Sequence, residues 1–394
     1  MRVNPVFLSL IVLSLCFGCA EKSEKSKQIL VKNTLNIDRS AETVSLDLNS
    51  LDLMGETVNL DALGIVDAET QKSLVVQVVD SDSDGTLDAL LFQPEVKALS
   101  EKTFKVVQRD SMSLEIEDRC YSRFVPERTD DYAWENDRVA FRTYGPTAQK
   151  MVEDGVKGGT LSSGIDAWLK RVDYPIINKW YKKELETDGS YHKDTGEGLD
   201  NFHVGPSRGV GGTAVKVDTT YYTSRNYVSW KTLYNGPIRT SFILNYATWD
   251  AAGNQISEEK HISLDYGSNL SRFEIKVNGI DTLSAGLTLH ENDGEVAINE
   301  EKSWLSYWEP HEDSELGTGI VVPKGTMIGH EHYVTDKADE SNLFAHLKVA
   351  DQKVVYYAGF SWKKSGQFET KKAWEDYLGD FAEKINSPLE VVVK

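Results

Sequence analysis

Residues 238–246 (IRTSFILNY) and 270–277 (LSRFEIKV) decide the fold class, because apolar and polar residues alternate along both stretches. Such alternation places apolar side chains on one face of a strand and polar side chains on the other. Residues 73–79 (SLVVQVV) and 103–107 (TFKVV) have a similar β-rich pattern, and turns of glycine, asparagine and aspartate separate these stretches. This spacing predicts a mostly β chain built from antiparallel sheets rather than βαβ units.

The chain is expected to fold as two β-rich units of unequal size. A boundary is placed near residues 110–128, with a small β-sandwich over residues 29–115 and a large antiparallel β-sandwich over residues 116–394. A chain of 394 residues is long enough to bury one or two large cores. Apolar residues recur at helical spacing over residues 371–385, which predicts a C-terminal helix. A second, short helix is expected within residues 175–183 (PIINKWYKK).

The N-terminal segment MRVNPVFLSLIVLSLCFGC has a basic start, an apolar centre and a cysteine at its end. This pattern is typical of a secretion signal, and the apolar run is shorter than the ~20 residues that a membrane-spanning helix requires. We interpret residues 1–19 as a lipoprotein signal peptide, Cys19 as the lipidation site and residues 20–28 as a flexible leash. The expected location is the outer membrane, facing the periplasm or exposed at the cell surface, with the lipid anchor as the membrane contact.

Composition argues against several classes of protein. The formal net charge is −19, whereas a nucleic-acid-binding protein concentrates basic residues on one face, so no nucleic-acid partner is expected. Apart from Cys16 and Cys19 only Cys120 remains, so neither an internal disulfide nor a cysteine metal cluster is expected. No HExxH or similar zinc spacing occurs, and no cofactor is expected. A small anionic substrate is still compatible with this negative net charge, because nearby arginines outweigh an acidic surface that lies beyond a Debye length of ~10 Å.

Residues 80–88 (DSDSDGTLD) resemble a calcium-binding loop, with carboxylates at positions one, three, five and nine and Gly85 at position six. Position twelve is Leu91, so the bidentate glutamate of such loops is missing. An aspartate-rich turn between two strands is the favoured interpretation, and a structural calcium ion is the alternative. The ligands of such an ion would be Asp80, Asp82, Asp84 and Asp88.

Residues 191–212 (YHKDTGEGLDNFHVGPSRGVGG) combine many titratable side chains with six glycines. The run GVGG fits neither a Walker nor a dinucleotide motif, because it lacks Gly-Lys-Ser/Thr and a β-like stretch follows in place of a helix. His192 and His203 are candidate proton-transfer groups, since neutral imidazole titrates near working pH. Lys193 and Arg208 are candidate substrate-binding residues, because both side chains donate hydrogen bonds to carboxylate or sulfate groups.

A second cluster lies in residues 131–146 (DYAWENDRVAFRTYGP). On a strand Arg138, Arg142 and Tyr144 would share one face, which predicts an anion-binding surface with Tyr144 as a proton donor. A solvent-facing strand edge is the alternative, since arginine is mostly exposed. Aromatic and basic side chains nearby suit an acidic sugar, which needs a surface for stacking and charges that neutralise it, although aromatic residues also form cores. These further candidates for substrate binding are Trp134, Trp180 and Lys170.

Several stretches together resemble a family of lipoproteins encoded beside polysaccharide-degrading enzymes in marine Bacteroidota and catalogued as a domain of unknown function. The resemblance covers nearly everything from about residue 110 to the end. It implies a main domain similar to the sandwich of galactose mutarotases and some polysaccharide lyases. The stretches are residues 131–146, 162–181 (SSGIDAWLKRVDYPIINKWY), 191–212, 235–242 (NGPIRTSF) and 262–275 (ISLDYGSNLSRFEI).

The resemblance implies an oligosaccharide dehydratase that acts in the breakdown of ulvan, the sulfated uronate and rhamnose polymer of green algae. Such a hydro-lyase removes water across carbons 4 and 5 of a non-reducing-end glucuronic or iduronic acid and leaves a 4,5-unsaturated residue. The expected partner is therefore an anionic oligosaccharide. A polysaccharide lyase that cleaves uronate glycans by β-elimination and a non-catalytic glycan-binding lipoprotein are the alternatives.

Dehydration requires a cation at the uronate carboxylate, a base for the proton at carbon 5 and an acid for the leaving hydroxyl. The resemblance supplies no catalytic residue, so the roles are assigned from the chemistry of the side chains. The residues expected to perform these three tasks are, in order, Arg208 with Arg142 or Arg138, His192 or His203, and Tyr144.

Overall fold

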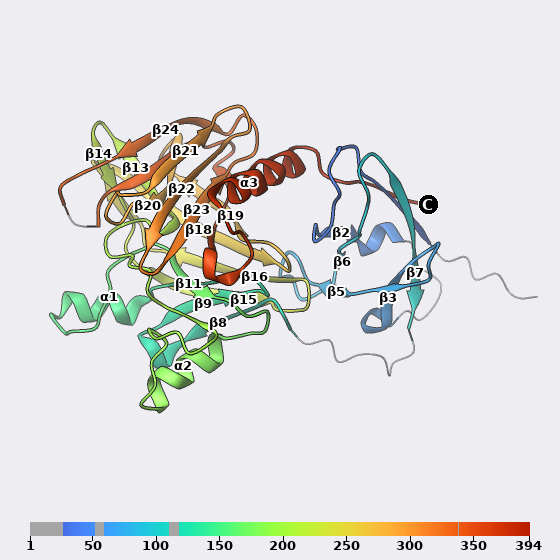
Figure 1. The fold of residues 1–394 in the computed structure, drawn as a ribbon, viewed down its shortest axis with the longest axis horizontal. Coiled ribbons are helices and arrows are strands. Elements are labelled where there is room, and N and C mark those ends of the chain that lie inside the picture. The colour runs from blue at the N-terminus through green and yellow to red at the C-terminus, as the bar shows by residue number, and fades with distance from the viewer. Residues whose placement is uncertain (1–26, 52–58, 110–117, 338) are drawn as a thin grey trace, which may run out of the picture.

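The computed structural model describes residues 27–51, 59–109, 118–337 and 339–394. Within these residues antiparallel β-strands dominate, and three α-helices complete the fold (Figure 1). The predicted fold class, mostly β with antiparallel sheets and a C-terminal helix, is confirmed. Residues 1–19, Cys19 and most of the predicted leash lie outside the described residues. None of the described helices has both the length and the apolar character that crossing a membrane requires.

A small unit at one end of the molecule consists of two sheets (Figure 1). Its core contains Phe92 and Phe104, whose rings pack edge to face at 5.6 Å. The last strand of the chain, β27, pairs with the first, β1, so the chain returns to this unit at its C-terminal end. The predicted division at residue 115 stays a prediction. In sheet order, the strands are β27 (Glu390–Val393), β1 (Gln28–Lys32), β7 (Glu101–Gln108), β3 (Leu63–Asp67) and β4 (Ser73–Leu74), and β2 (Val44–Asp47), β6 (Ala89–Phe92) and β5 (Val76–Val79).

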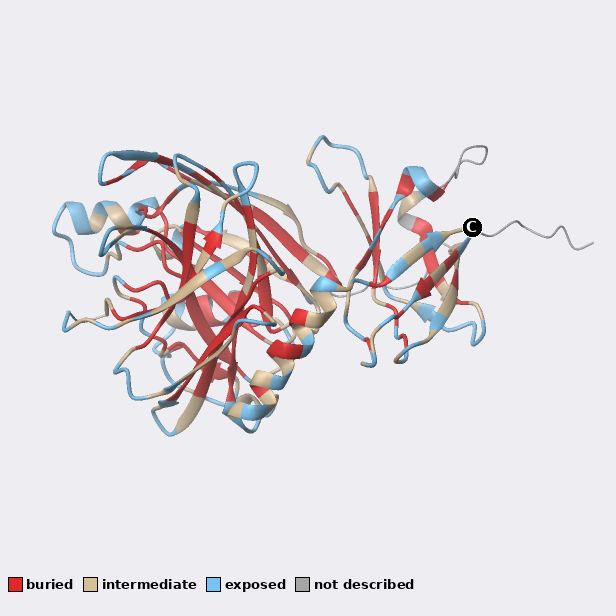
Figure 2. Cartoon of the chain, turned by 90° about the horizontal axis from the view of Figure 1, so that it is seen from above, coloured by how far each residue is buried: buried red, intermediate tan, exposed pale blue. Residues whose placement is uncertain are grey.

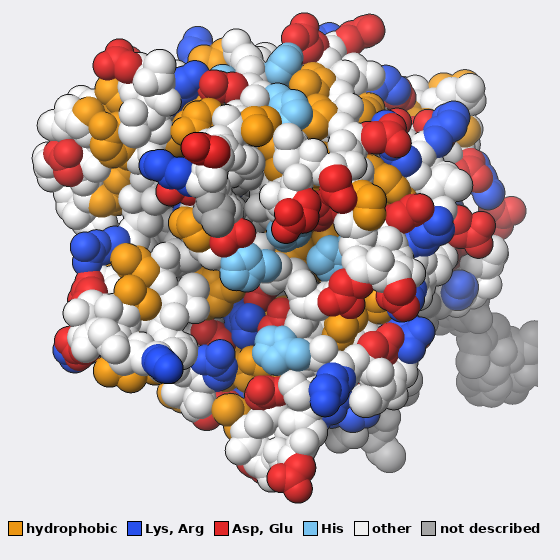
Figure 3. All heavy atoms as spheres, turned by 60° about the vertical axis from the view of Figure 1, so that its left-hand side comes forward, with side chains coloured by type: hydrophobic (Ala, Val, Ile, Leu, Met, Phe, Trp, Pro, Cys, Tyr) orange, Lys and Arg blue, Asp and Glu red, His pale blue; other side chains and the backbone are white. Residues whose placement is uncertain are grey.

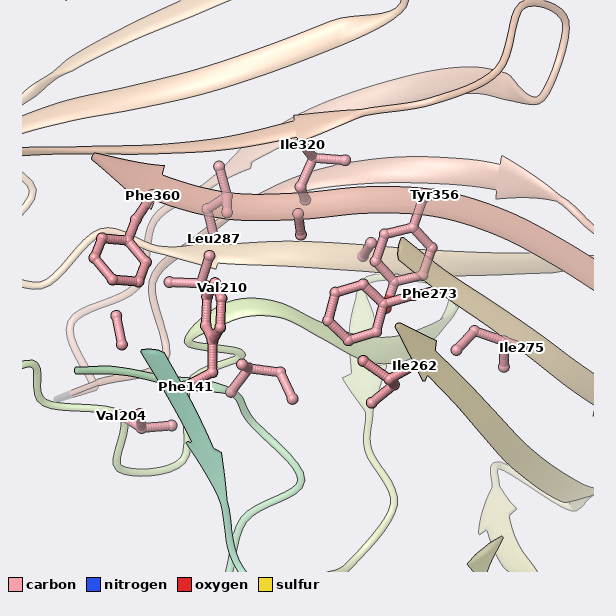
Figure 4. Packing of buried hydrophobic residues seen from close by; sticks show 14 of the residues in the cluster. Phe141, Val204, Val210, Ile262, Phe273, Ile275, Leu287, Ile320, Tyr356 and Phe360 are labelled. Carbon is pink, nitrogen blue, oxygen red and sulfur yellow. The ribbon is translucent and has the colours of Figure 1, made fainter. Parts of the chain in front are cut away.

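The large unit is built around a nine-stranded antiparallel sheet. In the predicted strand over residues 270–277, alternate side chains such as Phe273 and Ile275 are buried, as the period-two pattern requires. Phe273 stacks on Tyr356 of a neighbouring strand at 4.9 Å (Figure 4). In order, the strands are β15 (Tyr227–Tyr234), β16 (Arg239–Tyr246), β18 (Asn254–Asp265), β19 (Leu270–Asn278), β26 (Lys353–Trp362), β23 (Ser314–Val321), β22 (Trp304–His311) and β21 (Glu295–Asn299), and β17 (Trp249–Ala251) pairs with β18.

Two five-stranded sheets complete the large unit and share one apolar core with the nine-stranded sheet. Figure 4 shows Phe141, Val210 and Leu287 of these two sheets in that core. Figure 2 shows buried residues concentrated in the strands and exposed residues in the loops. One sheet contains β14 (Thr220–Tyr222), β13 (Val210–Val217), β20 (Thr282–Thr288), β25 (Asn342–Lys348) and β24 (Met327–Tyr333). The other contains β12 (Gly198–Leu199), β11 (Asp166–Lys170), β10 (Ala140–Thr143), β9 (Asp131–Glu135) and β8 (Tyr121–Val125).

The predicted helices are observed as α2 (Ile177–Glu186) and α3 (Lys371–Asn386). The side chain of Thr370 caps the start of α3 by accepting a hydrogen bond from the backbone N–H of Ala373. The buried face of α3 packs against β22 and β23 of the nine-stranded sheet. A further helix, α1 (Pro146–Glu153), begins at a proline and was not predicted.

The two units meet where β5 approaches the turn between β15 and β16. The side-chain amide of Gln77 donates hydrogen bonds to the carbonyls of Asn235 and Arg239. Its oxygen accepts hydrogen bonds from the backbone N–H groups of Ile238 and Arg239. One glutamine thus satisfies four backbone groups of the large unit, which fixes this contact between the units.

Candidate active site

A hollow of about 530 Å³ opens in the large unit. The end of β10 and the segments 159–161 and 200–206 form its walls, together with His192. Figure 3 shows histidine side chains gathered around a hollow, with acidic and basic side chains between them. Of the predicted site residues, this hollow brings together Arg142, Tyr144, His192 and His203.

A second hollow of about 370 Å³ adjoins the first, because His192 and Asn201 line both. Lys193, the predicted ligand for an anionic group, lies on the wall of this second hollow and is exposed. His311 and Lys364 line it as well. His192 therefore stands between two open spaces, each of a size that suits part of an oligosaccharide.

Arg142 is buried on the hollow wall, where carboxylates surround its guanidinium group. Its Nη2 atom lies 2.5 Å from Asp166 Oδ2 and 2.9 Å from Asp200 Oδ2, and its Nε atom also donates to Asp166. Its Nη1 atom lies 3.7 Å from an oxygen of Asp131 and donates to the Tyr191 hydroxyl. Because these partners occupy the guanidinium, Arg142 binds the protein itself in this geometry, and its predicted contact with a substrate carboxylate would require a rearrangement.

The carboxyl groups around Arg142 have shifted pKa values. Burial raises the pKa of Asp131 to about 6, although Arg142 acts against this shift. Burial and the neighbouring Asp200 raise the pKa of Asp166 well above its usual range. The cluster therefore retains a proton at pH values where ordinary carboxyl groups are ionised. This cluster was not predicted. Asp166 joins it because it lies opposite Arg142 in the β10–β11 register.

His192 has a defined tautomer because its Nδ1 atom lies 2.6 Å from the backbone carbonyl of Asp200. A carbonyl oxygen only accepts hydrogen bonds, so Nδ1 carries a hydrogen, and in the neutral ring Nε2 has the lone pair. The side chain is 53% exposed, and no partner for Nε2 is found within the described residues. The same Asp200 binds Arg142 through its side chain, so the carboxylate cluster positions this imidazole.

His203 lies on the same hollow and pairs with a carboxylate. Its Nε2 atom is 2.9 Å from Asp339 Oδ2, and its side chain is 67% exposed. The backbone carbonyl of His203 accepts a hydrogen bond from Nε2 of His290, 3.0 Å away. His203 is thus exposed on the wall of the hollow and held by Asp339, a position from which it can contact a substrate.

Tyr144 follows β10 and is only 9% exposed. Burial and the nearby Asp166 raise the pKa of its hydroxyl well above the usual range. The ring lies 5.5 Å from the Arg142 guanidinium, and no hydrogen bond of the hydroxyl is found within the described residues. A protonated phenol on the wall of a hollow is a proton donor and not a base.

Sequence reasoning missed a group formed by His290, Glu309 and His311 as a unit. Nδ1 of His290 lies 2.6 Å from Glu309 Oε1, and burial raises the pKa of Glu309. Burial opposes the charged form of His290, but the hydrogen bond that its Nδ1–H donates to Glu309 raises the pKa of His290 overall. Burial and the charge of His290 lower the pKa of His311 to about 4. One sequence pattern could have predicted part of this group. Glu309 and His311 are two residues apart on β22, and such residues share one face of a strand.

The structure places Arg208 and Arg138 outside the lining of both hollows. Arg208 is buried and donates hydrogen bonds to Ser163 Oγ and to the carbonyls of Thr213 and Pro206. Burial lowers its pKa to about 10. Nε of Arg138 donates to Asn269 Oδ1. This placement does not support the carboxylate-binding role predicted for either arginine, because their donors serve the protein's own acceptors.

The remaining predicted ligands lie in the interior. Trp134 is fully buried and donates from its indole to Ser271, and Trp180 packs against Trp168 at 5.4 Å. Lys170 is 2.8 Å from Glu135 Oε2, and both side chains are 0% exposed. The burial of these two tryptophans fits the interpretation, which the sequence left open, that they belong to the core. Lys170 holds a buried carboxylate that also accepts hydrogen bonds from the start of α2.

The aspartate-rich loop brings carboxylate oxygens of Asp80, Asp82 and Asp88 within 4.8 Å of one another, and Asp84 is not in this group. All four carboxylates accept hydrogen bonds from backbone N–H groups of the loop itself, as in the favoured Asx-turn interpretation. The calcium alternative stays a prediction.

The fold and the site describe an antiparallel β-sandwich protein with a histidine-lined hollow. The chain belongs to the family described as Domain of unknown function (DUF4861), whose model matches residues 31–391. It is 58% identical over 381 residues to Uncharacterized protein P7 of Formosa agariphila, a match that covers 96% of each chain.

Two solved structures from Enterococcus faecalis have a similar fold. One is a protein in the glycosyl hydrolase family 38, with a TM-score of 0.53 and 10% identity, covering 94% of this chain and 48% of that one. The other, an α-mannosidase of strain V583, has a TM-score of 0.50 and 11% identity, with 94% and 46% covered. The chain thus spans about half the length of these proteins, and at this identity the likeness concerns the fold.

Proposed function

We propose that this protein is an oligosaccharide dehydratase. It removes water across carbons 4 and 5 of a glucuronic or iduronic acid at the non-reducing end of ulvan-type oligosaccharides and leaves a 4,5-unsaturated uronic acid. Three lines support the proposal: the resemblance of the sequence to a lipoprotein family, which implies such an enzyme, a fold similar to that of a glycoside hydrolase, and the chemistry of the hollow.

The observation that carries the proposal is the meeting of His192 and Tyr144 on one hollow. His192 has a free Nε2 lone pair and suits abstraction of the proton at carbon 5. Tyr144 is protonated and suits donation to the leaving 4-hydroxyl. His203 with Asp339 lies on the same wall and suits hydrogen bonding to the substrate. The choice between the two histidines, which the sequence left open, falls on His192.

His192 and Tyr144 together account for both protons that move in the elimination step. Nε2 of His192 takes the proton from carbon 5, and the electron pair of that C–H bond forms the double bond to carbon 4. The bond from carbon 4 to its hydroxyl oxygen breaks, and that oxygen receives the Tyr144 proton and leaves as water. Each proton transfer contributes about 10²–10⁴-fold to the rate.

The test uses oligosaccharides that end in glucuronate or iduronate, with ultraviolet absorbance and mass spectra as readouts. The proposal predicts a new conjugated double bond and a product lighter by one water, with no shortening of the chain. A polysaccharide lyase would use the same groups but would cut the chain and leave the combined product mass unchanged. Binding without any change in the sugar would instead support a glycan-binding lipoprotein.

The variants His192→Ala and Tyr144→Phe should each lower turnover by about 10²–10⁴-fold. His330→Ala is the matched control, because His330 lies on β24, pairs with Glu300 and lines neither hollow. The assignment fails if both site variants keep full activity while they fold normally.

We also propose that the mature protein is an outer-membrane lipoprotein, facing the periplasm, with surface exposure as the alternative. The proposal rests on the leader sequence that ends at Cys19. Labelled palmitate should enter the wild-type protein and not Cys19→Ser. Equal labelling of both proteins would contradict Cys19 as the lipidation site, and no labelling of the wild type would contradict the anchor.

A further inference from the structure

The group of His290, Glu309 and His311 brings one ligand atom from each residue within 4.8 Å of the others. His290 lies in the turn that follows β20, at a φ of +43°, a conformation that non-glycine residues adopt rarely. Glu309 and His311 project from the same face of β22. The fold thus brings together two imidazoles and a carboxylate from distant segments of the chain.

The contact between His290 and Glu309 requires a positive species between the two residues. Nε2 of His290 is 3.0 Å from the carbonyl of His203, so this nitrogen carries a hydrogen. In the neutral ring Nδ1 then presents a lone pair to Glu309 Oε1, which lies only 2.6 Å away. Either a proton or a metal ion must separate these two lone pairs.

His311 distinguishes these two options. Its Nε2 atom is buried and has no hydrogen-bond partner within the described residues. A proton between His290 and Glu309 would leave this nitrogen unsatisfied, which is costly for a buried polar atom. A metal ion would satisfy all three residues at once.

We propose that His290, Glu309 and His311 bind a divalent cation of the zinc type. Two imidazoles and one carboxylate are a ligand set that zinc accepts, with a fourth position left for water or substrate. Zinc bonds of about 2.0–2.2 Å place tetrahedral ligand atoms about 3.3–3.5 Å apart, so small side-chain movements complete the site. The His203 carbonyl fixes the ring of His290, as hydrogen-bonded carbonyls do for metal-binding histidines. The proposal revises the expectation, drawn from the sequence, that the protein holds no cofactor.

The cation also has a role in the proposed reaction, and this part rests on the proposed function. His311 and His192 line the same hollow, so an ion at His311 is reached from the space beside the base. The substrate carboxylate needs a positive partner, and the guanidinium of Arg142 is occupied by Asp166 and Asp200. The uronate carboxylate takes the open position on the metal, which makes the proton at carbon 5 more acidic.

The first experiment measures metal binding without any sugar. Chelator-treated, tag-free protein is titrated with Zn²⁺, and bound metal is counted by mass spectrometry. One ion per chain is expected, with affinity at least 100-fold lower in His311→Ala and Glu309→Gln and unchanged in His330→Ala. Calcium should not compete, because it prefers six to eight oxygen ligands. A wild-type protein that binds no more zinc than His311→Ala overturns the proposal.

A zinc-edge anomalous map of wild-type crystals keeps the test valid if a variant fails to fold. A peak between the three side chains is expected, and a zinc-soaked crystal without this peak refutes the site.

The second experiment separates this proposal from the proposed function. The affinity for a glucuronate-terminated oligosaccharide should fall at least tenfold when zinc is removed, whereas that for a neutral-ended oligosaccharide should not change. Equal affinity with and without zinc overturns the carboxylate role. Zinc-dependent binding without formation of a double bond upholds the metal site and contradicts the dehydratase instead.

Discussion

Replacing Arg142 by methionine should lower the free energy of unfolding by about 3–5 kcal/mol at neutral pH. Arg142 donates two hydrogen bonds to Asp166 and one to Asp200, and both carboxylates are nearly inaccessible to water. Hydrogen bonds to charged groups contribute about 1.5–3 kcal/mol each, so their simple sum is larger. Asp166 limits the loss, because its buried carboxyl group takes up a proton when its cation is removed.

The pH dependence of this loss has a definite sign. Without Arg142 the folded-state pKa of Asp166 rises further above its unfolded value, which is about 3.9. A carboxyl group with a raised folded-state pKa binds more protons when folded, so stability falls as pH rises through this range. The difference between wild type and Arg142→Met should therefore shrink as pH falls from 7 towards 4.

Urea unfolding followed by tryptophan fluorescence at several pH values measures both quantities. Arg225→Met is the matched control, because Arg225 pairs with Glu153 on the surface, where its side chain is 61% exposed. That change should cost about 1 kcal/mol or less. A loss below about 1 kcal/mol for Arg142→Met, or a loss that grows as pH falls, would refute the reasoning.

Three further outcomes are expected from stability measurements. Gly209→Ala should destabilise the protein by more than about 2 kcal/mol, because a Cβ there would lie 1.9 Å from the Ile165 carbonyl oxygen at a φ of +60°. Gly325→Ala, where a Cβ would meet open space, should cost about 1 kcal/mol in the same thermal unfolding experiment. Urea unfolding of the wild type should show that stability falls as pH rises from 4 to about 6, because the folded-state pKa of Asp131 is about 6. Asp131→Asn should make this fall smaller, and an unchanged profile would contradict the prediction. Lys170→Met should cost about 3–5 kcal/mol in urea, and a near-neutral effect would disprove its buried ion pair.

The sequence predicted those features that depend on local periodicity. Period-two alternation in residues 270–277 predicted a half-buried strand, and β19 is one. Helical spacing in residues 371–385 predicted α3 within one residue of its observed end. The eight-residue helix α1 escaped prediction, because it is short and buries only Ala148.

The site was predictable only in part. His192 and His203 lie on one loop, so their meeting on one hollow follows from their short separation. The burial of Arg208 did not show in the sequence, since the strands around it come from distant parts of the chain. The convergence of His290 with Glu309 was equally hidden, because it depends on how β20 and β22 are placed by separate sheets.

The mass of the product formed from a glucuronate-terminated oligosaccharide tests the central claim most directly. Wild-type protein should yield a product lighter by one water and of unchanged chain length, and His192→Ala should yield almost none in the same time. Two shorter fragments with unchanged combined mass, a product heavier by one water, or equal yields from both proteins would contradict the account.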